Sequence, residues 1–306
     1  MSDIKTAFVF PGQGSQSVAM MADFVEESIV TDTFQEASDA LGYDMWKLVA
    51  EGPAESLNET QRTQPALLTA STALWRLWEQ QGHAKPLLLA GHSLGEYSAL
   101  VAAGALNFSD GVKLVEQRGH FMQQAVPAGT GKMAAIIGLA DELIAEACQE
   151  AAGSEVVSPV NFNSPGQVVI AGNAEAVERA MVACKDKGAK RALPLPVSVP
   201  SHCSLMKPAA EKLADSLANI EIATPLIPVV NNVDVAVCES ADDIKDALIR
   251  QLYCPVRWTE SVIYLANQGI NQLMECGPGN VLSGLARRID RSLTAQQLSK
   301  KDTFNQ

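Results

Sequence analysis

Residues 87–104 read LLLAGHSLGEYSALVAAG, and this stretch decides the fold. The apolar run 87–90 predicts a buried strand, and the small residues of 96–104 predict a helix. Between them, residues 91–95 fit the pattern G-x-S-x-G, in which a serine stands on a sharp turn from strand to helix. An ordinary turn that contains a serine by chance is the alternative, but the strand before and the helix after argue against it. We therefore predict that Ser93 is a nucleophile, exposed at a helix N-terminus where the helix dipole favours a developing oxyanion.

The segments on either side of this turn also alternate between strand and helix. Residues 6–10 predict a strand and 65–81 a helix. We expect Ser109 to cap a further helix that ends before Pro127. After residue 198 the alternation resumes, with a strand expected over 226–233. Such alternation is typical of an α/β protein whose parallel sheet is covered on both faces.

The pattern changes after Pro127. Strands are predicted over 133–139, 156–163, 167–172 and 189–198, with one helix over 141–151 and another capped by Asn173. The resulting order, βαββαβ, is that of a ferredoxin-like unit. We therefore predict a large subdomain of residues 1–126 and 199–306, with residues 127–198 inserted as a small subdomain. The polar tail after about residue 291 is expected to fray.

The composition excludes several classes of protein. Hydrophobic residues make up 47% of the 306 residues, enough for a substantial core. The net charge of −12 argues against general nucleic-acid binding. No apolar run approaches the roughly 20 residues of a membrane span, and the run 7–10 is too short for a signal peptide. The six cysteines are scattered without a C-x-x-C motif, so we expect a cytoplasmic protein with reduced thiols and no metal site.

A serine nucleophile needs a base, and the chain offers four histidines. His83 lies in a polar loop, His92 adjoins the serine so that its side chain points elsewhere, and His120 lies within a predicted helix. His202 follows a predicted strand at the carboxyl edge of the sheet, where such sites form. Position favours His202 and leaves the others open.

Eight motifs occur in order along the chain and resemble one family, the bacterial malonyl-CoA:acyl-carrier-protein transacylases of fatty acid synthesis. That family is similar to the acyltransferase domains of polyketide synthases. The resemblance covers residues 6–290 and implies an α/β-hydrolase-like large subdomain with a ferredoxin-like insertion. The motifs are PGQGSQ (11–16), TQPALLTAS (63–71), GHSLGEYSAL (91–100), VEQRGHFMQ (115–123), VNFNSPGQVVIAG (160–172), VPSHCSLM (199–206), PVVNNVD (228–234) and GPG (277–279).

The resemblance implies a role for six residues. Ser93 matches the nucleophile, His202 the general base and Arg118 the arginine that binds the malonyl carboxylate. Gln13 and Leu94 match the residues whose backbone N–H groups form the oxyanion hole. Gln251 matches the residue whose backbone carbonyl orients the histidine. The implied partners are malonyl-CoA and an acyl carrier protein, and the implied chemistry needs no cofactor.

Arg118 also has a physical reading of its own. A guanidinium can hold a free carboxylate through two parallel hydrogen bonds, which would distinguish malonyl from acetyl groups. Glu116 is an unsuitable partner, because helical side chains meet at i,i+3 or i,i+4 and not at i,i+2.

Two other functions remain open from the residues alone. A serine esterase or thioesterase would need an Asp or Glu beside the base, and Asp110, Asp141 and Asp186 are poorly placed for that role. A non-catalytic scaffold that binds the carrier would not need the complete set of Ser93, His202 and Arg118.

An acidic carrier calls for a basic patch on a chain that is itself acidic. Two clusters qualify, and we favour the first because it precedes His202 by about ten residues. They are Lys187, Lys190 and Arg191, and Arg287 with Arg288.

Overall fold

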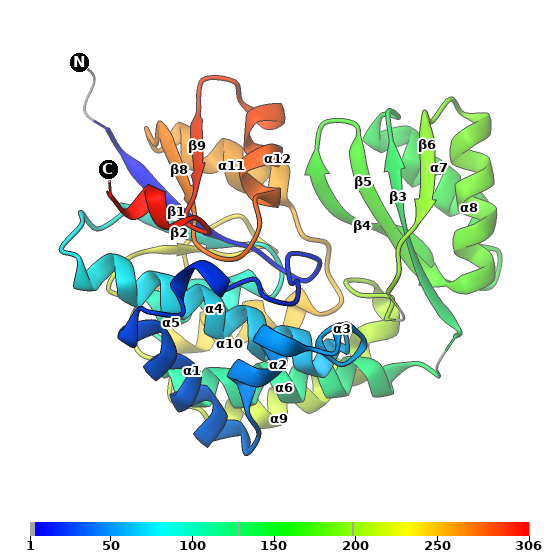
Figure 1. Cartoon of the computed structure of the whole chain (residues 1–306). Helices are drawn as coiled ribbons and strands as arrows, with labels where there is room; N and C mark the ends of the chain where they lie inside the picture. The colour runs from blue at the N-terminus through cyan, green and yellow to red at the C-terminus, as the bar shows by residue number, and fades with distance from the viewer. Residues whose placement is uncertain (1–3, 128, 198, 306) are drawn as a thin grey trace.

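The computed structural model describes residues 4–127, 129–197 and 199–305, which form two separate sheets (Figure 1). The larger sheet has five strands in the order β7-β2-β1-β8-β9, and every neighbouring pair is parallel. This arrangement confirms the predicted α/β class. The strands are β1 (Thr6–Phe10), β2 (Leu88–Gly91), β7 (Val229–Val230), β8 (Gln272–Glu275) and β9 (Thr294–Gln297).

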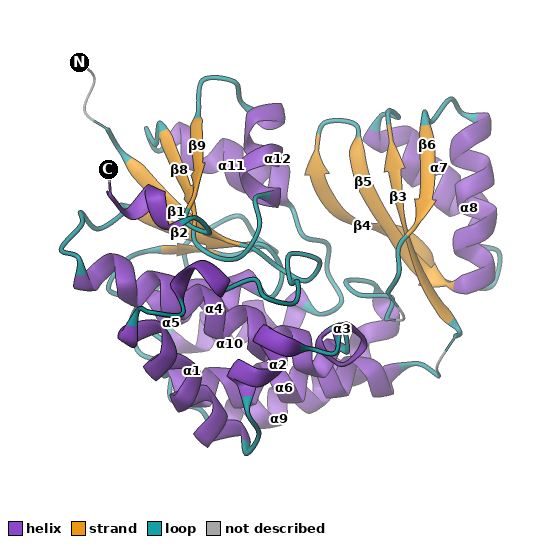
Figure 2. Ribbon diagram, in the orientation of Figure 1, coloured by secondary structure: helices purple, strands orange, loops and turns teal. Residues whose placement is uncertain are grey.

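Helices cover both faces of this sheet, as the apolar strands require (Figure 2). Side chains of β1 alternate between the faces: Phe8 and Phe10 enter the larger core, and Ala7 and Val9 enter the smaller one. The larger core includes residues of α1 (Ser28–Leu41), α2 (Met45–Glu51), α3 (Ala54–Leu57), α4 (Thr60–Gln80), α5 (Gly95–Ala102), α6 (Phe108–Ala125), α9 (Lys207–Ala218) and α10 (Ala241–Gln251). The smaller core is closed by α11 (Trp258–Asn267) and α12 (Val281–Ile289).

The second sheet has four antiparallel strands in the order β4-β5-β3-β6. Two helices, α7 and α8, pack on one face around a core that includes Ile136 and Ile170. The order along the chain is βαββαβ, as predicted. Its elements are β3 (Gly131–Ile137), α7 (Asp141–Ala152), β4 (Val157–Ser164), β5 (Gln167–Asn173), α8 (Ala174–Asp186) and β6 (Arg191–Pro194).

All four strands of this sheet lie within residues 131–194, which supports the proposed division into 127–198 and the two flanking segments. The expected strand 189–198 is shorter in the structure, ending at Pro194, and residue 198 lies outside the described residues.

The capping predictions need correction. Asn107, not Ser109, caps α6, because its side chain accepts hydrogen bonds from the backbone N–H groups of Ser109 and Asp110. Asn173 holds the N-cap position of α8, yet its side chain accepts from the Val156 N–H at 2.8 Å instead.

Two element lengths also differ from expectation. The helix predicted over 65–81 begins at Thr60, with Pro65 inside it, and the strand predicted over 226–233 is paired only at Val229–Val230.

The expectation of a frayed tail is wrong. Residues 294–297 form β9, which pairs in parallel with β8 at the edge of the larger sheet. Leu293, Leu298 and Phe304 are buried, so a few buried apolar residues anchor this polar segment. A final 3-10 helix, η3, covers Lys301–Asn305.

Candidate active site

Ser93 lies at the turn between β2 and α5 with a backbone φ of 52°. This left-handed conformation is strained for a residue other than glycine and is typical of functional turns. Its flanking glycines are sterically required. A Cβ on Gly91 would lie 1.9 Å from the Gly95 carbonyl carbon, and one on Gly95 would lie 2.0 Å from the Phe10 carbonyl oxygen. The turn therefore has the tight geometry that the G-x-S-x-G pattern predicts.

His202 meets Ser93, although 109 positions separate them in the chain. The Ser93 Oγ lies 2.8 Å from His202 Nε2, and His202 Nδ1 lies 2.7 Å from the backbone oxygen of Gln251. A carbonyl oxygen only accepts, so Nδ1 carries the ring hydrogen and Nε2 is free to accept the serine proton. This is the arrangement that a general base needs.

His202 reaches this position from the segment between β6 and α9, and its φ is 65°. Its backbone N–H donates to the Leu252 carbonyl oxygen at 3.0 Å, which ties the segment to the end of α10. Burial, followed by the positive charge of Arg118, lowers the pKa of His202 to about 3. The imidazole is therefore neutral at physiological pH.

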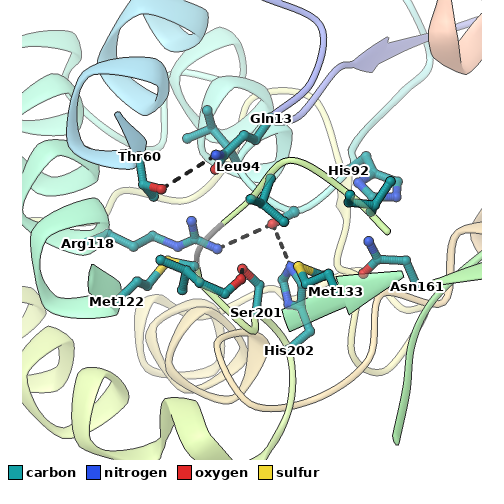
Figure 3. Close-up of a pocket in the computed structure, with 14 residues that line it drawn as sticks. Gln13, Thr60, His92, Leu94, Arg118, Met122, Met133, Asn161, Ser201 and His202 are labelled. Carbon is teal, nitrogen blue, oxygen red and sulfur yellow. Dashed lines mark hydrogen bonds between the residues drawn. The ribbon is translucent and has the colours of Figure 1, made fainter. Parts of the chain in front are cut away.

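Arg118 approaches the same oxygen from α6 (Figure 3). Its Nη2 lies 3.4 Å from Ser93 Oγ, and its side chain is buried, with 1% exposed. Two amide oxygens hold the guanidinium: Nη1 donates to Gln64 Oε1 at 2.8 Å, and Nη2 donates to Gln251 Oε1 at 2.9 Å. Arg118 Nε is buried with no partner among the described residues. Such a cation beside the nucleophile is suited to an anionic acyl group.

Glu116 does not pair with Arg118, as the helical spacing predicts. Glu116 pairs with Arg62 at 3.2 Å and leaves Arg118 free to face the nucleophile.

Two residues that the sequence reasoning gave no role, Asn232 and Glu96, hold the turn that carries Ser93. Asn232 accepts from the Ser93 N–H at 2.7 Å, and its Nδ2 donates to the Gly91 carbonyl oxygen at 2.6 Å. Glu96 Oε2 accepts from the Asn232 N–H at 3.0 Å and from Gln251 Nε2 at 2.8 Å. Both residues lie within motifs that carry the family resemblance, 91–100 and 228–234, and Glu96 is also a lone charged residue in a run of small and apolar ones.

Gln251 therefore forms hydrogen bonds with four residues of the site, which are His202, Arg118, Glu96 and Ser93. Besides its carbonyl and its Oε1, its Nε2 also donates to the Ser93 carbonyl oxygen at 3.1 Å. The resemblance pointed to its backbone only, whereas its side chain links the nucleophile to Arg118 and Glu96.

Gln13 and Leu94 line the same pocket as Ser93. Among the described residues, neither backbone N–H has a hydrogen-bond partner, so both are available to an oxyanion. The pocket has a volume of about 100 Å³ and an apolar wall from the four-stranded sheet and the segment that follows it. That wall consists of Met133, Leu195, Val197 and Val199.

Among the described residues, none of the other three histidines makes a hydrogen bond to the Ser93 hydroxyl, although His92 lines the same pocket. His92 Nε2 donates to Asn163 Oδ1 at 2.8 Å, His83 stacks on Trp78, and His120 is exposed on α6. Cys203 is buried and its Sγ lies 3.2 Å from the Pro200 carbonyl oxygen; burial raises its pKa to about 11, so the thiol is protonated. Within residues 4–127, 129–197 and 199–305, no group of three His, Cys, Asp or Glu side chains could hold a metal ion. In the same part of the chain, no helix is long and apolar enough to cross a membrane.

Comparisons with known proteins agree with this site. The family described as "Acyl transferase domain" matches residues 7–287. Two curated relatives are both named malonyl CoA-acyl carrier protein transacylase. The one from Salmonella typhimurium is 66% identical over 96% of each chain, and the one from Bacillus subtilis is 46% identical over 98% of this chain and 95% of the relative.

Solved structures are equally similar. An acyl carrier protein S-malonyltransferase from Vibrio cholerae superimposes with a TM-score of 0.97 at 62% identity, covering 98% of this chain and 99% of the other. A malonyl-transacylase in complex with a type II polyketide synthase acyl-carrier protein gives a TM-score of 0.97 at 59% identity, covering 98% of each chain. On this basis the chain belongs to the acyl transferase domain family and, within it, to the malonyl CoA-acyl carrier protein transacylases.

Proposed function

We propose that this enzyme transfers a malonyl group from malonyl-CoA to the phosphopantetheine thiol of an acyl carrier protein, through an ester on Ser93. One observation carries the proposal: Ser93 Oγ lies 2.8 Å from His202 Nε2 and 3.4 Å from Arg118 Nη2. A base and a buried cation thus converge on one hydroxyl. The names of the relatives support the same substrates.

In the first half-reaction, His202 Nε2 takes the Ser93 proton while Oγ attacks the thioester carbonyl. The N–H groups of Gln13 and Leu94 receive the oxyanion, and Arg118 holds the malonyl carboxylate. The carbon–sulfur bond then breaks, and the imidazolium returns its proton so that coenzyme A leaves as a thiol.

The second half-reaction is the reverse path with a new thiol. The carrier's thiol gives its proton to His202 and attacks the malonyl ester, and Ser93 Oγ recovers the proton as it leaves. Neither half needs a bound cofactor. We also propose that this transfer supplies fatty acid synthesis in the cytoplasm, in line with the activity named for the relatives.

Two alternatives are less well supported. An esterase acting on neutral esters has no use for a buried guanidinium at its nucleophile, and His202 Nδ1 meets a carbonyl where an esterase has a carboxylate. A scaffold would not need the hydrogen-bonded pair of Ser93 and His202.

The intact mass of the protein after mixing with malonyl-CoA tests the proposal. We expect one malonyl adduct, which disappears when holo acyl carrier protein is added and reappears on the carrier. Rapid turnover to free malonate would favour the esterase, and an unchanged mass would favour the scaffold.

A further inference from the structure

Arg118 is a buried cation, and no carboxylate in the described part of the chain pairs with it directly. Among the described residues, no carboxylate lies within ion-pair distance of its guanidinium, and its two Nη atoms donate to neutral amide oxygens and the serine hydroxyl. An unpaired buried charge is strongly unfavourable. A negative charge must therefore compensate the guanidinium of Arg118 before an acyl carboxylate reaches it.

The carboxylate of Glu96 reaches Arg118 through a single side chain. Arg118 Nη2 donates to Gln251 Oε1 at 2.9 Å, and Gln251 Nε2 donates to Glu96 Oε2 at 2.8 Å. The amide thus points its oxygen at the cation and its nitrogen at the carboxylate, so its dipole is aligned with both charges. Glu96 is 3% exposed, and little solvent screens this interaction.

Of the ionisable groups described near Glu96, Arg118 is the positive charge that acts on its carboxylate. Tyr97, the next residue on α5, lies against the guanidinium, with the ring centroid 5.3 Å from Arg118 Cζ. In the segment after β7, the Cys238 sulfur accepts a hydrogen bond from the Asn231 amide. Asp234 forms an ion pair with Arg250 at 2.7 Å. His202, held by α10, is neutral.

We propose that Glu96 is the resting counter-ion of Arg118, that the malonyl carboxylate replaces it, and that Glu96 then takes up one proton from solvent. This inference rests on the proposed function. Without proton uptake, the malonyl-enzyme would hold two buried carboxylates against one guanidinium. With it, the net charge of the buried site is unchanged, and Glu96 keeps its bonds from Asn232 and Gln251 through the unprotonated oxygen.

The titration of Glu96 is suited to this exchange. Burial raises its pKa to about 7, and the bonds from Gln251 and Asn232 and the charge of Arg118 oppose the rise. A malonyl carboxylate on Arg118 neutralises that opposing charge, so the pKa of Glu96 rises further in the acyl-enzyme. Proton uptake should therefore be small at pH 6, where Glu96 is already protonated, and substantial at pH 7.5.

The experiment counts protons per acyl group. Malonyl-CoA or acetyl-CoA is mixed with the whole enzyme in weak buffer with a pH indicator, and intact mass gives the adduct formed on Ser93. At pH 7.5 we expect more than about half a proton taken up per malonyl group and none per acetyl group. Release of coenzyme A is common to both substrates, so the acetyl arm corrects for ionisation of its thiol.

Glu96→Gln is the matched variant, because its amide oxygen can accept both hydrogen bonds that Glu96 Oε2 accepts. It should form the malonyl adduct without taking up a proton. Equal proton counts for malonyl and acetyl in the wild type, or undiminished uptake in Glu96→Gln, would overturn the inference. If the variant does not fold, the wild-type comparison decides by itself. Absence of a malonyl adduct in the wild type would refute the proposed function instead.

Discussion

The side-chain oxygen of Asn232 lies 2.7 Å from the backbone nitrogen of Ser93 and accepts its hydrogen. Because Asn232 Nδ2 also donates to the Gly91 carbonyl oxygen, one buried amide joins both arms of the nucleophile turn. The strained φ of Ser93 is held from outside the turn, by the segment that follows β7.

Asn232→Ala should therefore destabilise the protein by roughly 2–4 kcal/mol, since two buried backbone groups lose their partners. Acylation of Ser93 should slow as well, because the turn can relax. Asn231→Ala is the control: the Asn231 side chain bonds to Ala236, Cys238 and the Asp234 N–H and has no hydrogen bond to the turn among the described residues. Chemical denaturation and the acylation rate per folded molecule measure the two effects. Equal acylation rates in the two variants would show that Asn232 is structural only.

Ser93→Ala should form no malonyl adduct while keeping its fold. Ser98→Ala serves as the control, since Ser98 is a buried serine of the same helix, α5, with no hydrogen-bond partner among the described residues. Intact mass after incubation with malonyl-CoA distinguishes them. A malonyl mass on the Ser93 variant would mean that another group is the nucleophile.

Arg118→Ala should reduce malonyl transfer by at least about a hundredfold, because two charge-assisted hydrogen bonds are worth about 1.5–3 kcal/mol each. Acetyl transfer should change much less, since an acetyl group offers no carboxylate. Arg62→Ala, which removes the half-buried pair with Glu116, should leave the ratio of the two rates unaltered. Equal losses of malonyl and acetyl transfer in Arg118→Ala would assign the arginine a purely structural role.

The pH dependence of acylation follows from the pKa of His202. That pKa is lowered by burial to about 3, below the ordinary 6.5, so the base stays neutral and active as the pH falls. We expect kcat/KM for malonyl-CoA to show no acidic limb between pH 5 and pH 7. An acidic limb near 6.5 would indicate a solvated, unperturbed histidine.

Carrier docking at the first basic cluster stays a prediction, since Arg191 pairs with Ile137, four positions along β3 from the pocket-lining Met133. Arg191 and Gln167 both pair with Ile137, and Arg288 Nη1 donates to Gln167 Oε1 at 2.7 Å, so the two basic clusters meet at one end of the four-stranded sheet. Lys187 is already paired with Glu146 and Glu150. Lys190→Glu with Arg191→Glu should raise the carrier's KM several-fold and leave acylation by malonyl-pantetheine unchanged.

The control for that double variant is Lys5→Glu with Lys85→Glu. It changes the net charge equally but alters exposed residues near the amino ends of β1 and β2, away from Ser93. An unaltered carrier KM in the first variant, or an equal rise in both, would move the docking site elsewhere, with Arg287 and Arg288 the next to test.

Local patterns sufficed for much of the fold. The turn at Ser93 was predictable because its glycines have no alternative: the Cβ of any other residue would overlap a neighbouring backbone. The strand β9 was missed because its backbone pairing with β8 and the burial of Leu293 and Leu298 are tertiary effects that a polar sequence conceals.

The site residues also fall into those that local patterns predict and those that they do not. The pattern predicts Ser93 and position favours His202, whereas the contacts that hold Arg118, with Gln64 and Gln251, could not be predicted because they join helices far apart in the chain. Glu96 and Asn232 were missed because their partners lie 136 to 155 positions away in the chain. No local periodicity reports such contacts.

The carbonyl that orients His202 has a consequence for which nucleophile can release the acyl group. It fixes the tautomer but adds little stabilisation to a charged imidazolium, so His202 is a weak proton acceptor. A thiol with a pKa of about 8.5 surrenders its proton far more readily than water with a pKa of about 15.7. The acyl-enzyme thus discriminates between a thiol and water by their acidity. Transfer to an incoming pantetheine thiol is favoured over hydrolysis even without any contribution from contacts with the carrier protein.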